Sequence, residues 1–213
     1  MARSEDIKTP LARFAFTGDL FKPRTSDSGR QTYGCTLLFP KGTDISALRN
    51  AALKACTDEW GDKAKQWIKD EVIKSPFLDG DGKQAIAKKT GERLTGFAGH
   101  TFLRVSSGPE YPPRLFDAKV VPIARSSEKD DDCPLYSGVY GYAVINAYTW
   151  EHPQNGKGVT FSVSMVQVTK PGERLGGGGG PDPDKFLKAE TVPDEGEVPA
   201  ETKTGAGAAG FFG

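Results

Sequence analysis

The sequence predicts a mainly β domain, an antiparallel barrel with one helical insertion, and three observations carry this prediction. Apolar and polar residues alternate in several segments, most clearly in residues 138–150 and 158–168. Helical periodicity is confined to one stretch, residues 43–75, which follows the second alternating segment. Turn-forming residues such as Asn155-Gly156 separate the alternating segments.

The first two strands are predicted in the first forty residues. Ala12, Phe14 and Phe16 alternate with Arg13 and Ala15, which is the period of a strand with one buried face. GRQTYGCTLLFP predicts the second strand, ended by Pro40-Lys41-Gly42, and its apolar face carries Tyr33, Cys35, Leu37 and Phe39.

The helical insertion comes next. TDISALRNAALKACTDEW offers Thr43 or Asp44 as N-cap, followed by a helical stripe of Ile45, Leu48, Ala52, Leu53 and Cys56. GDKAKQWIKDEVIKSP predicts a second helix that Pro76 stops, with Trp67, Ile68 and Val72 on its apolar side. The polar residues 79–96 predict a long loop.

The remaining strands follow this loop. They are predicted in HTFLRVSS, PRLFDAKVVPI, SGVYGYAVINAYTW and GVTFSVSMVQV, and Asn155-Gly156 predicts a type I′ hairpin turn between the last two. Five or six strands with helices after the second do not fit a βαβ sheet. They favour an OB-fold-like barrel, a fold that carries ligands on an open strand face. A β-sandwich is the alternative.

The chain changes character at five consecutive glycines, residues 176–180. We therefore expect a folded domain over residues 1–175 and a Gly-rich joint with a disordered acidic tail over residues 176–213. From Pro181 onward, seven acids and three bases give a charge of −4, whereas the first 180 residues carry 25 bases and 21 acids. Within the tail, Phe186 and Leu187 are expected to pack on the domain, and the alternative is that this segment begins the disordered part. The tail ends with Phe211 and Phe212 close to its last residue.

Several classes of protein are disfavoured by the residues present. No apolar run approaches the length of a membrane span, and the N-terminus does not resemble a signal peptide. Cys35, Cys56 and Cys133 suggest neither a disulfide framework nor a CxxC site, so we expect reduced thiols and a cytoplasmic protein. Neither GxxxxGK[ST] nor a GxGxxG between strand and helix is found, and no cofactor is expected.

Catalytic residues are not expected either. LDGDGK, residues 78–83, resembles the start of a calcium loop but lacks the later acidic ligands, so no metal is predicted. A metal-dependent nuclease using Asp79, Asp81 and His100 is one alternative, although no motif requires it.

Residues 138–150 carry the most informative pattern for function. One face is small or apolar and suits a barrel interior, while the other carries Tyr140, Tyr142, Val144, Asn146, Tyr148 and Trp150. This second face is either a platform on which nucleic-acid bases stack or a second core under the helices. Tyr33 is a further candidate for stacking. Basic residues near aromatic ones are candidate phosphate ligands: Arg13, Lys22, Arg24, Arg30 and Arg104.

The sequence also resembles the phage-type single-stranded DNA-binding proteins, a family once catalogued as a domain of unknown function. The resemblance covers most of residues 11–178. It depends on LARFAFTGDLFKPR, LLFPKGTD, SPFLDGDG, GFAGHTFLRVSS and the closing blocks YSGVYGYAVINAYTW and NGKGVTFSVSMVQVTKPGERLGG, in this order. It implies an OB-fold that binds single-stranded DNA without sequence preference in phage replication, recombination and repair. It also implies the cytoplasm of the host cell.

The same resemblance suggests a role for the tail. Single-stranded DNA-binding proteins commonly end in an acidic tail with an apolar tip. Acids in the tail can compete with DNA for a basic groove, and Phe211 and Phe212 can dock on replication or recombination proteins. Weak duplex binding, RNA binding and a homodimer stay open. A protein-interaction module without DNA affinity is the other alternative.

Overall fold

Five strands close into a barrel in the computed structural model, which describes residues 1–88 and 90–175. Each strand bonds to the next around the ring β2-β4-β7-β10-β9, and β9 returns to β2. All neighbours are antiparallel except β7 and β10, which run parallel. The strands are β2 (Ala12–Ala15), β4 (Gln31–Pro40), β7 (His100–Ser107), β9 (Tyr140–His152) and β10 (Gly156–Lys170).

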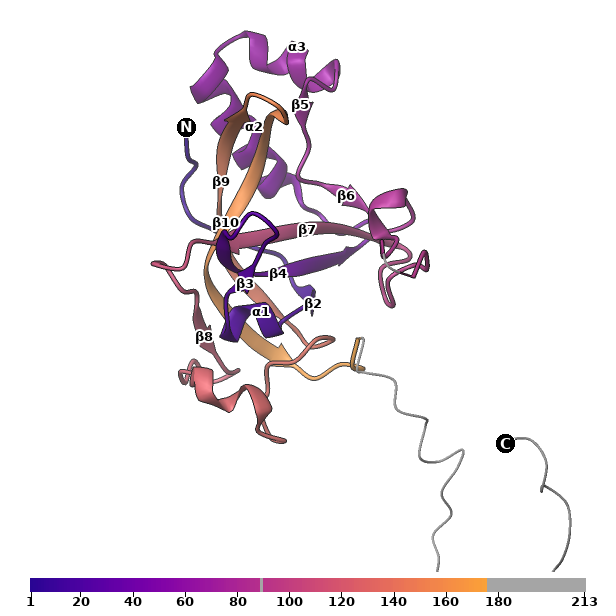
Figure 1. The fold of residues 1–213 in the computed structure, drawn as a ribbon, viewed down its shortest axis with the longest axis vertical. Coiled ribbons are helices and arrows are strands. Elements are labelled where there is room, and N and C mark those ends of the chain that lie inside the picture. Colours follow the sequence, from indigo (N-terminus) through magenta and orange to yellow (C-terminus); the bar gives the residue numbers. More distant parts are fainter. Residues whose placement is uncertain (89, 176–213) are drawn as a thin grey trace, which may run out of the picture. The chain divides into compact units, whose positions relative to one another are not determined.

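The ring order is 1-2-3-5-4 when the five strands are numbered along the chain, which is the Greek-key order of a five-stranded OB-fold barrel. The predicted fold class is therefore confirmed, and the β-sandwich is not formed. In Figure 1 the long β9–β10 hairpin runs along the molecule, and β4 and β7 cross it.

Five shorter strands each pair with a part of one barrel strand. β1 pairs with β9, β3 with β4, β6 with β7, and both β5 and β8 with β10. These elements, with the short helices, are β1 (Ile7–Lys8), α1 (Gly18–Phe21), β3 (Arg24–Thr25), β5 (Ile73–Lys74), β6 (Leu78–Asp79), η1 (Lys83–Ala85), β8 (Arg114–Phe116) and η2 (Arg125–Lys129).

The helical insertion follows β4, as predicted, and consists of α2 (Ser46–Trp60) and α3 (Lys63–Lys69). The N-cap of α2 is Ile45, which makes no side-chain capping bond, and not Thr43 or Asp44 as predicted. Asp44 still accepts a hydrogen bond from the N–H of Ser46, the first residue of α2, at 2.9 Å. Buried residues of α2 join the barrel core, because the helix lies beside the upper part of β9 (Figure 1).

The predicted second helix is shorter than expected. It ends at Lys69 and does not extend to Pro76, because Glu71 has a positive φ of 56° and the chain then forms β5. Ile68 and Val72, expected on an apolar side, are 39% and 46% exposed.

The barrel interior is lined by the face of β9 that the sequence predicted. Gly141, Ala143, Ile145, Ala147 and Thr149 are buried, whereas the alternate residues are partly exposed. These interior residues share one cluster with side chains from every other barrel strand, among them Phe14, Leu37, Leu103 and Phe161. A tightly packed interior fixes which face of β9 points outward.

Phe16 is a correction to the predicted first strand. The strand ends at Ala15, and Phe16 takes a positive φ of 57° and is 50% exposed. Its ring lies against Phe97, with centroids 6.1 Å apart, outside the barrel interior.

A second, smaller apolar cluster lies on the outer side of β2, β4 and β7. Leu38 and Phe102, which are paired across β4 and β7, are covered by Ala85, Phe97 and Leu175. The segment predicted as a loop therefore covers one end of the outer face of β4 and β7. The other end, with Thr32, Arg104 and Ser106, remains at least partly accessible.

The β9–β10 hairpin differs from the predicted type I′ turn. Gly156 has a positive φ of 76°, but Asn155 is not among the residues with positive φ. The Asn155 N–H donates to the His152 carbonyl at 3.2 Å, and Gly156 pairs with His152. This arrangement matches a three-residue loop closed by a left-handed glycine.

The predicted tail, residues 176–213, lies outside the described residues, and so do Phe186, Leu187, Phe211 and Phe212. The boundary after residue 175 therefore stays a prediction. Cys35, Cys56 and Cys133 are free and buried.

Candidate nucleic-acid interface

A groove of about 710 Å³ crosses the outer face of the barrel beside the upper part of β9. Its walls come from segments far apart in the chain: the β3–β4 hairpin on one side, and β5 with β9 on the other. The residues that line it are Met1, Ser26, Arg30, Thr32, Lys74, Ser106, Tyr148, Trp150, Glu151, His152, Asn155 and Thr160. Glu151 is the one acid among them, and it forms an ion pair with Lys157 at 3.4 Å. We call this groove the barrel groove.

Strand register places these residues on one surface. Tyr148 pairs with Thr160, and Trp150 pairs with Gly158, so their side chains leave the sheet on the same side. The outer side of β7 carries Arg104 and Ser106, and Ser106 pairs with Gly34 on β4. Small side chains therefore form the floor, and larger ones form the walls.

The barrel groove lies where an OB-fold binds its ligands. In this fold, oligonucleotides bind on the face of the second and third strands, between the loop that joins strands 1 and 2 and the loop that joins strands 4 and 5. Here those strands are β4 and β7, and the first loop contains Ser26 and Arg30. The second loop contributes Asn155.

The aromatic wall consists of Tyr148 and Trp150, both partly exposed. The indole of Trp150 lies against Gly158, since a Cβ at Gly158 would lie 2.5 Å from its Cζ2 atom. Cations lie close to both rings: Lys74 Nζ is 5.9 Å from the Trp150 ring centroid, and Arg3 Cζ is 5.6 Å from that of Tyr148. Such cation-flanked rings can stack on bases, and the cations can hold phosphates beside them.

The opposite wall is basic. Arg30 is exposed in the hairpin that lines the barrel groove, and Arg24 pairs with Thr32 at the groove floor. Partial burial and, to a smaller degree, the charge of Arg24 lower the pKa of Arg104. Arg24 Nε also lies 4.0 Å from a carboxylate oxygen of Asp19, and Arg104 donates a hydrogen bond to the Gln84 carbonyl at 3.2 Å.

Of the predicted phosphate ligands, only Arg30 lines the barrel groove together with two of the predicted stacking residues. Arg24 is paired with the groove residue Thr32, and Arg104 lies on β7 two residues before the groove residue Ser106. Lys22 lies elsewhere and forms an ion pair with Glu128 at 3.0 Å. Arg13 holds the chain beyond β10, because its guanidinium donates to the carbonyls of Gly138 and Glu173 at 3.3 and 2.8 Å.

The other predicted stacking residues are also outside the barrel groove. Tyr33 lies on the same side of β4 as Cys35 and Leu37, with Arg125 Cζ 4.7 Å from its ring centroid. Tyr140 and Tyr142 share the outer face of β9 with Tyr148 and Trp150, but at its opposite end. The alternative that this face forms a second core is not what the structure shows, since its aromatic residues remain partly exposed.

Sequence patterns did not reveal Arg3, Lys8 and Lys74 as part of this face. Arg3 and Lys8 reach it because the N-terminal segment pairs with Tyr148 and Val144 of β9, and Lys74 reaches it because β5 pairs with Gly158. The alternation of the short segments is too brief to predict strands. The one available signal was the presence of bases beside isolated apolar residues, as in Ile7-Lys8 and Ile73-Lys74.

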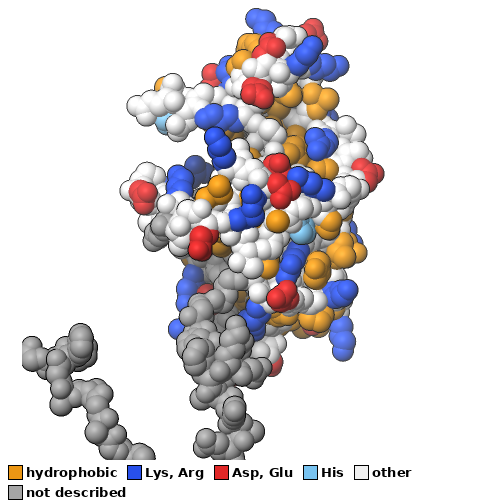
Figure 2. Space-filling view, turned by 90° about the vertical axis from the view of Figure 1, so that its right-hand side faces the viewer, with side chains coloured by type: hydrophobic (Ala, Val, Ile, Leu, Met, Phe, Trp, Pro, Cys, Tyr) orange, Lys and Arg blue, Asp and Glu red, His pale blue; other side chains and the backbone are white. Residues whose placement is uncertain are grey.

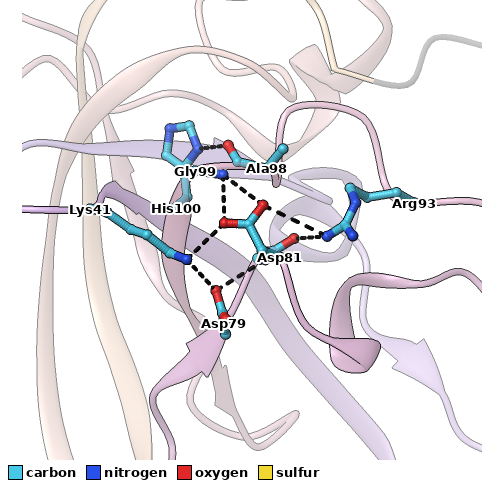
Figure 3. A network of polar contacts seen from close by, with 8 residues as sticks. Lys41, Asp79, Asp81, Arg93, Ala98, Gly99 and His100 are labelled. Atoms are coloured by element: carbon cyan, nitrogen blue, oxygen red, sulfur yellow. Dashed lines mark hydrogen bonds and ion pairs between the residues drawn. The ribbon is translucent and has the colours of Figure 1, made fainter.

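A network of ion pairs occupies the acids of the predicted calcium-like loop. Lys41 Nζ lies 2.9 Å from a carboxylate oxygen of Asp79 and 2.7 Å from one of Asp81, and Asp81 also accepts from the Gly99 N–H (Figure 3). Hydrogen bonds from Lys41 are the main reason why the pKa values of both carboxyls are lowered. The face around β6 carries acids and bases side by side, as Figure 2 shows.

The candidate nuclease residues therefore have a structural role. His100 Nδ1 lies 2.8 Å from the Ala98 carbonyl and not from either aspartate. Within residues 1–88 and 90–175, no three His, Cys, Asp or Glu side chains are grouped so that they could hold a metal ion.

Comparison with known proteins supports a nucleic-acid interface. Residues 5–196 match the model of a family described as the ssDNA-binding protein of Enterobacter phage Enc34. The chain belongs to this family. It is also 30% identical, over 81% of its length and 88% of the relative's, to a protein called p50 from the Acyrthosiphon pisum secondary endosymbiont phage 1.

Solved structures share the fold of this Enc34-family chain. It aligns with the single-stranded DNA-binding protein of bacteriophage Enc34 in complex with ssDNA at a TM-score of 0.56 and 18% identity, covering 80% of this chain and 89% of that one. With gp2.5, a single-stranded DNA-binding protein of bacteriophage T7, the TM-score is 0.52 at 13% identity, covering 92% and 100%.

The Enc34-family match agrees with the resemblance that the sequence motifs carried. It extends past residue 175 and so covers the five glycines as well as the barrel. Among the helices of the described residues, none has both the length and the apolar character needed to cross a membrane.

Proposed function

We propose that this chain binds single-stranded DNA in the barrel groove, without preference for sequence. The observation that carries the proposal is that Tyr148 and Trp150 line the same groove as Arg30, at the ligand-binding position of an OB-fold. Family membership and the names of the two phage relatives with solved structures support it.

Binding would combine two kinds of contact. Bases stack on Trp150 and Tyr148, and each stack contributes about 1–3 kcal/mol whatever the base. Arg30, Arg24 and Arg104 contact backbone phosphates and release counterions. The floor of small side chains leaves room for one strand to lie against the sheet. Neither a cofactor nor a catalytic group is required.

We further infer that the protein coats single-stranded DNA during replication, recombination and repair of phage DNA in the cytoplasm of the host cell. A single strand exposes its bases, whereas a duplex hides them in the stack, so the aromatic wall favours single strands. Duplex DNA would be held weakly, by phosphate contacts alone.

Fluorescence anisotropy of labelled oligo-dT and of a matched duplex tests this function. We expect tight binding of the single strand that weakens as salt rises, and much weaker binding of the duplex. If neither DNA is bound at low salt, the barrel face serves a protein partner instead, and the proposal fails.

For the tail, we propose that Phe211 and Phe212 dock on replication or recombination proteins and that the acids upstream compete with DNA. The support is the sequence alone, with its charge of −4 from Pro181 onward and its aromatic tip. Replacing both phenylalanines with alanine should weaken recovery of such proteins from infected-cell extract and leave DNA affinity intact. Equal recovery with both chains would contradict this role.

A further inference from the structure

A second group of aromatic and basic residues lies on the outer face of β9, at the end opposite to the barrel groove. It consists of Tyr140, Tyr142, Lys8 and Lys170, and we call it the distal cluster. Lys8 Nζ lies 4.0 Å from the ring centroid of Tyr142, and Lys170 Nζ lies 5.8 Å from that of Tyr140. Both lysines are exposed, and both tyrosines are partly exposed.

Backbone pairing brings these four residues together from three segments. Lys8 of β1 is paired with Val144, next but one to Tyr142 on the same face of β9, and Lys170 of β10 is paired with Tyr140. Side chains at paired and diagonal positions of one sheet face lie within reach of each other. The arrangement is thus a consequence of register and does not depend on a single long side chain.

The surface between the barrel groove and the distal cluster is also basic. Arg3 lies over Tyr148, and Arg114 donates a hydrogen bond to the sulfur of Met165, which is paired with Val144. Asp6 lies on this stretch as well, where its carboxylate accepts a hydrogen bond from the Asn146 side chain. Bases therefore outnumber acids along the face.

The length of this face suits a strand of nucleic acid. Trp150 and Tyr140 are ten residues apart on β9, which corresponds to about 33 Å at the rise of a β-strand. Rings at both ends are flanked by cations, which is the combination that binds single strands through bases and phosphates. The core of a protein interface is instead depleted in charged residues.

We propose that the distal cluster is a second contact site for the same single-stranded DNA, which continues along β9 after it leaves the barrel groove. This inference rests on the function proposed above. A base stacks at Tyr142 or Tyr140, while Lys8 and Lys170 hold the adjoining phosphates. The protein therefore contacts more nucleotides than the barrel groove alone can hold.

Oligonucleotide length separates this inference from the proposed function. Oligo-dT of about 8 nucleotides fills the barrel groove, whereas oligo-dT of about 24 nucleotides also reaches the distal cluster. The full chain is compared with Tyr142→Ala and Lys8→Gln, and Trp150→Ala serves as the groove variant. Lys65→Gln on α3 is the control, because it removes one exposed positive charge away from this face.

We expect Tyr142→Ala to weaken binding of the long oligonucleotide at least about 5-fold and to leave the short one unchanged. Lys8→Gln should reduce the slope of log K against log salt by about 0.7 for the long oligonucleotide alone. Lys8 is exposed, so Lys8→Gln should fold normally. It therefore tests the inference even if Tyr142→Ala folds poorly.

The outcomes that overturn the inference are equally clear. Unchanged affinity of both variants for the long oligonucleotide would show that the strand does not follow β9. An equal loss for both lengths would place these residues in the primary site, contrary to the inference. If the unaltered chain binds neither oligonucleotide, the proposed function fails, and the second contact site fails with it.

Discussion

Single side chains in this protein take up their positions at the proposed interface because neighbouring residues leave space for them. Trp150 illustrates this, because its indole occupies space that a side chain at position 158 would fill, and Gly158 leaves that space free. The indole and the hydroxyphenyl ring of Tyr148 then form one wall of the barrel groove. Two predictions belong to this scale.

Trp150→Ala should weaken binding of single-stranded DNA by about 1–3 kcal/mol, because one base loses its stacking partner. Anisotropy titration at fixed salt measures the loss, and a thermal melt checks that the variant is folded. Tyr111→Ala is a matched control, since Tyr111 is 75% exposed and does not line the barrel groove. A variant that binds as tightly as the original chain would remove Trp150 from the interface.

The cysteine thiols should be unreactive in the folded protein. All three are buried, and burial raises the pKa of Cys56 to about 11 and raises that of Cys35 as well, so few thiolates are present at neutral pH. A thiol reagent such as Ellman's should give almost no colour in native buffer and three equivalents per chain in denaturant. Fast labelling without denaturant would argue against the burial seen here.

At the scale of elements, ion pairs and hydrogen bonds hold loops against the barrel. Lys41, which follows β4, binds Asp79 at the end of β6 and Asp81 just after it, and Asp81 accepts a hydrogen bond from the Gly99 N–H before β7 (Figure 3). This network holds the segment that covers Leu38 and Phe102. The barrel groove lies at the other end of the same strands, so the network stabilises the fold and leaves the groove open.

The network predicts loss of stability in acid. The folded-state pKa values of Asp79 and Asp81 are lowered, so their contribution is complete above the usual aspartate pKa, near 4, and is lost as pH falls through the lower folded values. The melting temperature should therefore fall as pH drops below about 4. Lys41→Gln should have a lower melting temperature at neutral pH and a shallower fall in acid, and parallel curves for the two proteins would contradict this assignment.

Arg13 provides a second test at this scale. Its guanidinium donates to Gly138 and Glu173, so Arg13→Ala should lower the melting temperature. Because Arg13 is outside the barrel groove, the affinity for a short oligo-dT should stay within about 2-fold of the original, a change of less than about 0.5 kcal/mol. A large loss of affinity without loss of stability would restore Arg13 as a phosphate ligand.

At the scale of the whole molecule, charge is distributed unevenly along the chain. The seven acids and three bases from Pro181 onward stand against a basic remainder. An anionic segment tethered to a basic protein can compete with DNA at a high effective concentration. The competition proposed for these acids would act on phosphate contacts and leave base stacking unaffected.

A chain that ends at Lys188 should therefore bind oligo-dT more tightly than the full chain at low salt, and the difference should shrink as salt rises. It should also lose part of its discrimination against duplex DNA. Anisotropy titrations of both chains at two salt concentrations measure this. Identical affinities would limit the tail to contacts with other proteins.

Much of this fold could be predicted because strands and helices differ in the spacing of apolar residues. The two faces of β9, the bounds of β7 and the helical insertion after β4 all followed from local patterns. The end of α3 at Lys69 and the exposure of Phe16 could not be predicted, since both depend on single residues with positive φ. The helix and strand propensities of the residues around them predict neither the end of α3 nor the exposure of Phe16.

The sequence predicted a barrel, with a sandwich as the alternative, and predicted that aromatic residues share one face of β9. It also indicated the family, through the order of its motifs. The tertiary structure alone decided which of these rings share a groove with Arg30, and which bases flank them. Arg3, near the N-terminus, and Lys74, in the middle of the described chain, reach the same face through pairing with β9 and β10. Such contacts depend on register between strands that are far apart in sequence, and alternation within one strand carries no information about its neighbour.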